Sequence, residues 1–167
     1  MRRGRHLKLQ ELIPFVLIGV ALIAFSGALV GVYLVIVKTK REKLWQERYE
    51  TLKSIVSSSH AIVTSFTAFH MEEMGVPVIR GSEQEQLSKE LSEAKSLLRK
   101  NISILQLLFK RKHIEKVLQA YVNVNSSLQD LLNIGPEDYA ADYMKSVSDE
   151  AELLSREAVE LAQKKCL

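Results

Sequence analysis

The sequence predicts an all-α protein in which a single N-terminal transmembrane helix continues into an up-down antiparallel four-helix bundle. Three observations predict it. An apolar run near the N-terminus is long enough to cross a bilayer, apolar residues after it recur at helical spacing, and glycine and proline interrupt that spacing at only two places. We therefore divide the chain into a basic tail (1–11), a transmembrane helix (12–37) and a bundle domain (38–167).

Residues 12–37 contain no charged side chain over twenty-six positions. A spanning helix needs about 20 apolar residues to cross about 30 Å of hydrocarbon. A secretory signal peptide is the competing interpretation, because Arg2, Arg3, Arg5 and Lys8 precede the run. The run is longer than the apolar core of a signal peptide, and no clear Ala-x-Ala site follows it. We expect an uncleaved signal anchor and a single-pass membrane protein.

Basic residues flank both sides of the span, so the positive-inside comparison does not decide orientation. Lys38, Lys40, Arg41 and Lys43 balance the four basic residues of the tail. Moving that tail across the membrane is the harder event for a first span. We expect an extracytoplasmic bundle domain and an N-terminus in the cytoplasm.

Small residues share one face of the predicted span. Gly27 and Gly31 have the spacing that lets two helices approach closely in lipid, and Ala24 and Ala28 extend the same face. The alternative is accidental composition, because small residues are common in spans. If the face packs, its partner is another membrane protein or a second copy of this chain.

The bundle helices are predicted over about 42–74, 82–109, 113–133 and 137–164. The first follows a heptad pattern typical of a coiled coil. Its seam is Trp45, Tyr49, Leu52, Val56, Ser59, Val63, Phe66 and His70.

The breaks between these helices come from two kinds of signal. Gly75 and Pro77 end the first helix, and Gly135-Pro136 precedes the fourth. No glycine or proline divides residues 82–134, so the turn near Lys110 is placed from length alone. One helix of 53 residues would be about 80 Å long, whereas a turn there gives helices matched well enough to lie side by side.

Basic clusters occur where an up-down bundle would return to the membrane. They are Lys38, Lys40, Arg41 and Lys43; Lys110, Arg111 and Lys112; and Lys164 and Lys165. Anionic headgroups attract such cations, so a lipid bilayer with anionic headgroups is an expected partner. The alternative is that cations suit helix C-termini, which explains part of the pattern.

Two further sets of residues stand out in the bundle helices. Ser59, Asn101 and Asn125 would lie at similar heights, as a polar core layer that fixes helix register or as the lining of a ligand site. Ile104, Leu107 and Phe109 make the second helix more apolar than one seam requires, which favours lateral contact with a partner. Deep burial inside the bundle is the alternative for that second set.

Composition argues against several classes of function. The net charge of +3 divides into +6 for residues 1–41, with seven Lys/Arg against one Glu, and −3 for residues 42–167, with sixteen against nineteen acids. A mildly acidic domain with few aromatics does not favour nucleic acid binding. One cysteine, Cys166, and four scattered histidines provide no metal or haem motif, so we expect no metal and no cofactor.

No nucleophile, base and orienter set emerges, so we expect no enzyme. The sequence favours a membrane-anchored helical-bundle interaction protein, an accessory, scaffold or assembly subunit of a membrane protein complex. The alternative is a ligand-binding sensor-type module that uses the polar layer.

Overall fold

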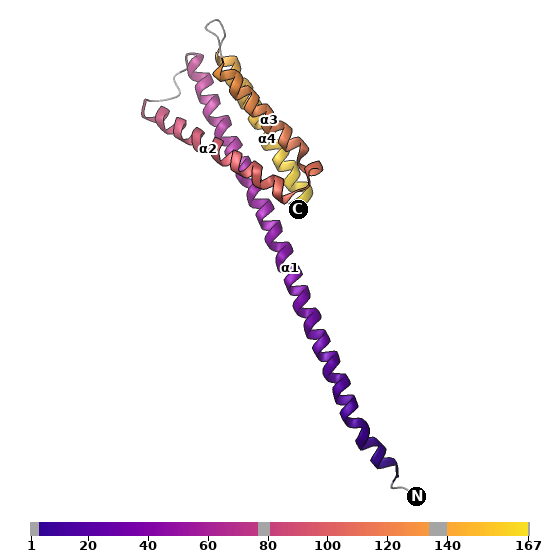
Figure 1. Cartoon of the computed structure of the whole chain (residues 1–167). Coiled ribbons are helices and arrows are strands. Elements are labelled where there is room, and N and C mark those ends of the chain that lie inside the picture. Colours follow the sequence, from indigo (N-terminus) through magenta and orange to yellow (C-terminus); the bar gives the residue numbers. More distant parts are fainter. Residues whose placement is uncertain (1–3, 77–80, 134–139, 167) are drawn as a thin grey trace. The chain divides into compact units, whose positions relative to one another are not determined.

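The computed structural model describes residues 4–76, 81–133 and 140–166, and for residues 4–18, 21, 81 and 82 it gives the course of the helix alone. The described residues form four helices and a few turn residues, with no strand among them: α1 (Gly4–Glu73), α2 (Gly81–Leu108), α3 (Arg111–Leu132) and α4 (Ala140–Cys166) (Figure 1). The all-α prediction is confirmed. Residues 137–139, where the fourth helix was predicted to begin, lie outside the described residues.

The chain divides into two compact units, Met1–Lys43 (unit 1) and Leu44–Leu167 (unit 2). The described part of unit 1 is entirely helical. In the described residues, one helix is long and apolar enough to cross a membrane. It reaches a mean hydropathy of 2.0 over 18 residues, none of them buried in the protein. Its large apolar side chains are exposed: Val20, Leu22, Ile23, Phe25, Leu29, Val30, Val32, Tyr33, Leu34, Val35 and Ile36.

All four helices contribute to one hydrophobic core in unit 2, mostly through residues three or four apart. From α1 it takes Leu52, Ile55, Ile62 and Phe66; from α2 and the residue after it Leu91, Ala94, Leu98, Ile102, Leu105 and Phe109; from α3 Ile114, Val117, Ala120 and Val124; and from α4 Val147, Ala151, Leu154, Ala158, Leu161 and Cys166.

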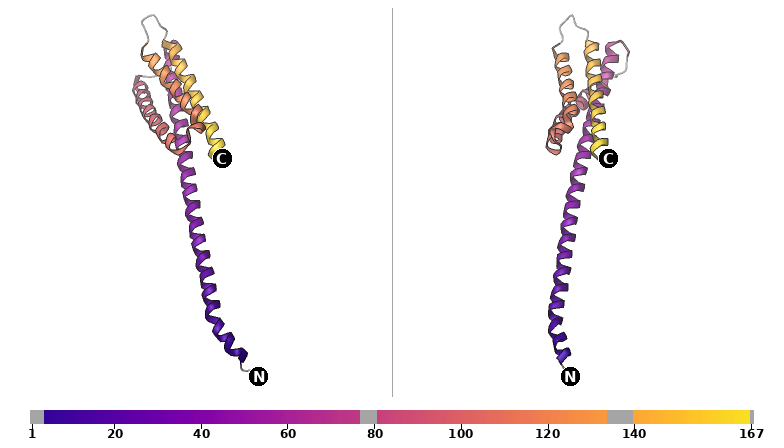
Figure 2. Two further views of the ribbon diagram at one scale, coloured as in Figure 1. Left: turned by 45° about the vertical axis from the view of Figure 1, so that its right-hand side comes forward. Right: turned by 90° about the vertical axis from the view of Figure 1, so that its right-hand side faces the viewer.

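Helices α3 and α4 lie side by side and run in opposite directions (Figure 2). Polar pairs along their shared edge fix the register. Lys116 Nζ is 3.8 Å from Glu157 Oε1, the Asn123 amide donates to Glu150 at 3.2 Å, and the Ser127 and Ser146 hydroxyls are 3.3 Å apart. The partners advance seven and then four residues along α3 while they recede by the same steps along α4.

Residues 44–73 of α1 contact both α2 and α4. Near their start, the Arg48 guanidinium contacts the end of α2 at the Leu108 carbonyl oxygen. Near their end, the Thr67 hydroxyl is 3.2 Å from that of Ser148, and His70 Nδ1 is 2.9 Å from the Ala141 carbonyl oxygen at the start of α4.

A glycine in the left-handed region ends α1. Gly75 has φ +80°. Its N–H donates to the Glu72 carbonyl at 2.9 Å, and the Val76 N–H donates to the Met71 carbonyl at 3.0 Å. This is the Schellman pattern, in which glycine adopts a positive φ at low cost. The break that the sequence places at Gly75 therefore has a conformational cause.

The break between α2 and α3 has neither glycine nor proline. Lys110 precedes α3 with extended dihedrals (φ −68°, ψ 137°) and no side-chain cap, and the His113 N–H donates to its carbonyl at 2.8 Å. Helix α3 begins at Arg111, two residues before the predicted start.

Candidate functional site

The small-residue face of unit 1 is open. A Cβ added at Gly27 or Gly31 would meet no atom within 4 Å, and Ala24 and Ala28 are exposed. The structure therefore leaves these four residues accessible on a helix whose surroundings are apolar side chains. The hydroxyl of Ser26 donates to the Leu22 carbonyl, so it needs no water.

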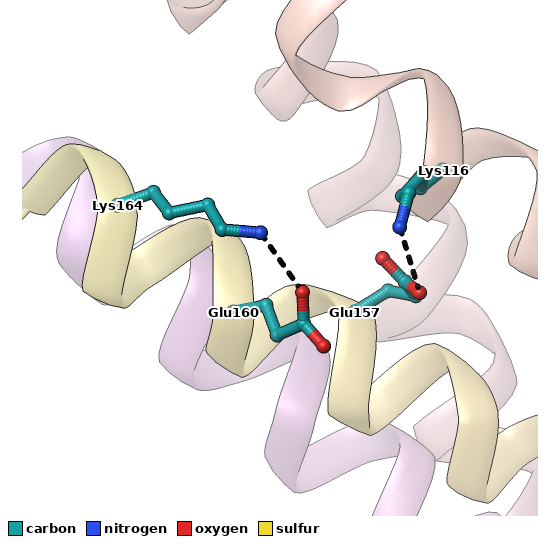
Figure 3. A network of polar contacts seen from close by, with 4 residues as sticks. All are labelled: Lys116, Glu157, Glu160 and Lys164. Carbon is teal, nitrogen blue, oxygen red and sulfur yellow. Dashed lines mark hydrogen bonds and ion pairs between the residues drawn. The ribbon is translucent and has the colours of Figure 1, made fainter.

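Unit 2 has a cationic end, which we define as Lys110, Arg111, Lys112, Lys164 and Lys165; all five are exposed. The Lys164 ammonium donates to the Glu160 carboxylate at 2.9 Å, and this bond raises the pKa of Lys164 and lowers that of Glu160 (Figure 3). The other four cations form no ion pair with a described carboxylate. Their charge is available to a partner.

His113 lies among these cations. Desolvation lowers its pKa below the ordinary value, and the positive charges of Lys165, Lys112, Lys110 and Arg48 lower it further. The start of unit 2 meets the end of α4 through the bond from the Trp45 indole to the Cys166 carbonyl oxygen, and it meets the end of α2 through the bond from Arg48 to the Leu108 carbonyl oxygen. The predicted basic residues of unit 1, Lys38, Lys40, Arg41 and Lys43, are exposed as well, and Lys38 Nζ is 3.8 Å from Glu42 Oε1.

Arg48 closes the α2 helix, a role that the sequence does not reveal. Its Nε and Nη2 donate to the Leu108 carbonyl oxygen at 3.1 and 2.9 Å, and its guanidinium lies 4.8 Å from the centre of the Phe109 ring. No basic residue occupies the last turn of α2 itself. Arg48 therefore supplies from α1 the positive charge that suits a helix C-terminus.

An aromatic pair lies at the same end of unit 2. The rings of Trp45 and Tyr49 stack with centroids 5.6 Å apart, and both side chains are exposed. The Trp45 indole N–H donates to the Cys166 carbonyl oxygen at the end of α4. Burial raises the pKa of the Cys166 thiol, with Arg48 acting in the opposite sense.

The structure separates the three residues predicted for lateral contact. Leu107 is 87% exposed and Ile104 is half-buried, whereas Phe109 is only 7% exposed and packs beneath Arg48. Phe109 belongs to the core, so it cannot present its ring to a partner. The interpretation of Phe109 as a lateral contact is corrected to the alternative, burial within the domain, because the chain turns there and tucks the ring inward.

The predicted polar layer does not form one hydrogen-bonded group among the described residues. The Asn101 amide donates to the Ser54 hydroxyl at 2.7 Å and the Leu97 carbonyl at 2.8 Å, while the half-buried Asn125 amide donates to the Tyr121 carbonyl at 2.9 Å. Ser59 is fully buried, and its hydroxyl has no hydrogen-bond partner.

The grooves of unit 2 lie elsewhere. A groove of about 550 Å³ between α1 and α2 is lined by residues that include His60, Ala61, Leu87 and Glu90. A second, of about 300 Å³ between α1 and α4, is lined largely by apolar residues such as Leu52, Val56, Ala158 and Val159. Neither is lined by a residue of the predicted polar layer. In the ranges that the structure describes, no three His, Cys, Asp or Glu side chains gather as metal ligands.

Comparison of this chain with protein-family models, with curated proteins and with solved structures finds no match.

Proposed function

We propose that this protein is a membrane-anchored helical-bundle interaction protein that serves as an accessory, scaffold or assembly subunit of a membrane protein complex. The observation that carries the proposal is the uncovered helix of unit 1, apolar on its exposed surface and open around Gly27 and Gly31. A lipid environment would remove the large apolar side chains of unit 1 from water. A second helix suits the small-residue face, because close backbone approach is what drives helix association where the solvent itself is apolar.

In this proposal unit 2 is an up-down antiparallel four-helix bundle. Three sets of contacts support that order: α1 with α2 through Arg48 and Asn101, α3 with α4 through their polar edge, and α1 with α4 through Trp45 and His70. The basic tail lies in the cytoplasm and the bundle outside it, for the reason of charge given above. Leu107 and Ile104 offer a second, lateral contact to a partner.

The test is the size of the particle that contains the full chain. Gly27→Leu with Gly31→Leu fills the small-residue face. The control, Gly19→Leu with Ser26→Leu, places two leucines seven residues apart on another side of the helix, and it adds somewhat less bulk because serine already carries a side chain. In mild detergent we expect the wild type and the control to migrate as a complex larger than a monomer, and the Gly27/Gly31 variant to shrink. A monomeric wild type, or equal loss in both variants, would contradict the proposal.

The sensor alternative has one supporting observation. The unpartnered hydroxyl of Ser59 is the kind of buried polar group that a bound polar ligand satisfies. A thermal-shift screen of polar small molecules on the full chain tests it. The alternative predicts a stabilising compound whose effect Asn101→Leu abolishes, and a stabiliser that works equally on that variant would count against it.

A further inference from the structure

The cationic end of unit 2 is built by segments that are far apart in the sequence. Lys110, Arg111 and Lys112 come from the turn and the first residues of α3, and Lys164 and Lys165 from the last turn of α4. Four of these five cations form no ion pair with a described carboxylate, whereas Lys164 pairs with Glu160. Like charges held together without counter-charges repel each other, so an anionic surface relieves this repulsion and is attracted strongly.

The groups beside this end suit a bilayer surface. Trp45 has its indole N–H bound at the end of α4 and nearly half of its surface exposed, and Tyr49 stacks on it. Tryptophan and tyrosine are enriched where hydrocarbon meets headgroups, because one part of the side chain is apolar and another is polar. Trp45 also follows unit 1 by only two residues in the chain, so the membrane span that we propose limits how far it can lie from lipid.

His113 adds a titrating group to the same end. The charged groups that face it are Arg48 from α1, Lys110 and Lys112 from the turn and the start of α3, and Lys165 from α4. Desolvation disfavours a proton on the imidazole, and these four cations disfavour it further. An anionic surface that neutralises them makes protonation easier, and the imidazolium then adds one more positive charge to the contact.

We propose that the cationic end of unit 2 binds the phosphate-bearing surface of an anionic bilayer, and that His113 makes this contact tighter as pH falls. The inference rests on the proposed membrane anchorage, and it adds a lipid class and a pH dependence to it. Lipid phosphates and free phosphate share the chemistry that lysine recognises, so the experiment must separate them.

The test measures the pKa of His113 by NMR in the full chain, placed in nanodiscs of zwitterionic lipid or of the same lipid with about one third phosphatidylserine. His60, exposed on α1 and beside the groove between α1 and α2, is the internal control. The surface potential of an anionic leaflet raises the pKa of a group at the surface by about half a unit to one unit and fades within a Debye length of about 8–10 Å. We expect that rise at His113 and less than a third of it at His60.

By thermodynamic linkage, a pKa that rises on binding means that the protonated protein binds the anionic surface more tightly. A group whose pKa rises by half a unit to one unit on binding tightens the contact by about 3- to 10-fold when the pH falls well below both pKa values. Lys110→Gln, Lys112→Gln and Lys165→Gln together should at least halve the rise. The matched control, Lys89→Gln, Lys100→Gln and Lys145→Gln, removes three exposed lysines elsewhere in unit 2 and should leave the rise intact.

Several outcomes would overturn the inference. An equal rise at His113 and His60, or no rise at either, would show that this end does not contact the surface. Inorganic phosphate or polyglutamate that reproduces the full rise in zwitterionic nanodiscs would assign the site to a free anion or an acidic protein segment. The His113 measurement and the Gly27/Gly31 test can fail independently. A protein that is monomeric in detergent can still show the pKa rise, and a protein that forms a larger complex can lack it.

Discussion

The two parts of α1 carry similar apolar side chains, which are exposed in unit 1 and buried in unit 2. In unit 1, Leu29 and Leu34 are more than half exposed; in unit 2, Ile55 and Ile62 are fully buried. Unit 2 covers its own apolar stripe with α2 and α4, whereas the described part of unit 1 has no second element to cover it. An apolar helical sequence therefore does not by itself determine whether its side chains are buried. The exposed apolar side chains of unit 1 need lipid or a partner to take their surface out of water.

The largest expected difference in the free energy of unfolding is between two Leu→Ala substitutions, one in each unit. Leu154→Ala removes a fully buried side chain from the core and should lower the free energy of unfolding of unit 2 by about 2–5 kcal/mol. Leu29→Ala, the matched change in unit 1, should alter that free energy by less than about 0.5 kcal/mol. Chemical denaturation of the full chain in nanodiscs, followed by Trp45 fluorescence, measures both. Equal losses would show that unit 2 depends on packing against residue 29.

The next effect concerns a contact within unit 2 that the sequence conceals. Arg48→Gln should cost about 1–3 kcal/mol, because the Leu108 carbonyl loses a charged donor and the Phe109 ring loses its cover. Hydrogen exchange should rise for the Phe109 amide, whose bond to Leu105 closes the last turn of α2. Arg99→Gln, on the exposed face of α2, is the control and should change neither quantity.

Much of this fold can be predicted from the sequence, because its signals are local and repeated. The apolar run of 12–37 and the helix end at Gly75 each depend on neighbouring residues. The heptad seam of the first bundle helix includes Trp45 and Tyr49, which are exposed, and omits Ile55 and Ile62, which are fully buried. The turn near Lys110 has no local signal and follows from matching helix lengths.

Residues defined by contacts between helices could not be predicted in the same way. Arg48 looks like an exposed heptad position until α2 returns beside it, and Phe109 looks available for a partner until the turn folds its ring inward. The predicted polar layer states how far along the bundle each residue lies, but it does not state which neighbouring helix each side chain faces. Asn101 therefore finds Ser54 on α1, whereas Asn125 bonds within its own helix.

A smaller effect, this time an increase in the free energy of unfolding, is expected from one substitution in the interior of unit 2. Ser59→Ala should raise the free energy of unfolding by about 1 kcal/mol, because it removes a buried hydroxyl without a partner. Ser65→Ala is the matched control, since the Ser65 hydroxyl is buried but donates to the Ala61 carbonyl at 2.9 Å, and it should bring no gain. Thermal unfolding of both variants compares them. A destabilised Ser59→Ala would mean that this hydroxyl has a partner in solution.

The smallest effect is a dependence of stability on pH. The pKa of His113 is lowered in the folded protein, so the unfolded chain takes up a proton more readily. The His113 contribution to stability is therefore present above the unfolded pKa of about 6.5 and is lost as the pH falls from there through the lower pKa of the folded protein. In zwitterionic nanodiscs, His113→Gln should flatten the fall in melting temperature between about pH 7.5 and 5.

We propose that α1 exposes its apolar side chains to lipid in unit 1 and buries them against its own chain in unit 2. Spin labels in a Cys166→Ser background measure this directly in lipid bilayers, through collision with oxygen, which concentrates in hydrocarbon, or with a water-soluble nickel chelate. We predict that labels at Leu29 and Leu34 collide with oxygen and not with nickel, that a label at Ile62 collides with neither, and that one at His60 collides with nickel. Free access of nickel to labels at Leu29 and Leu34 would show that these side chains lie in water and that unit 1 does not cross the bilayer there.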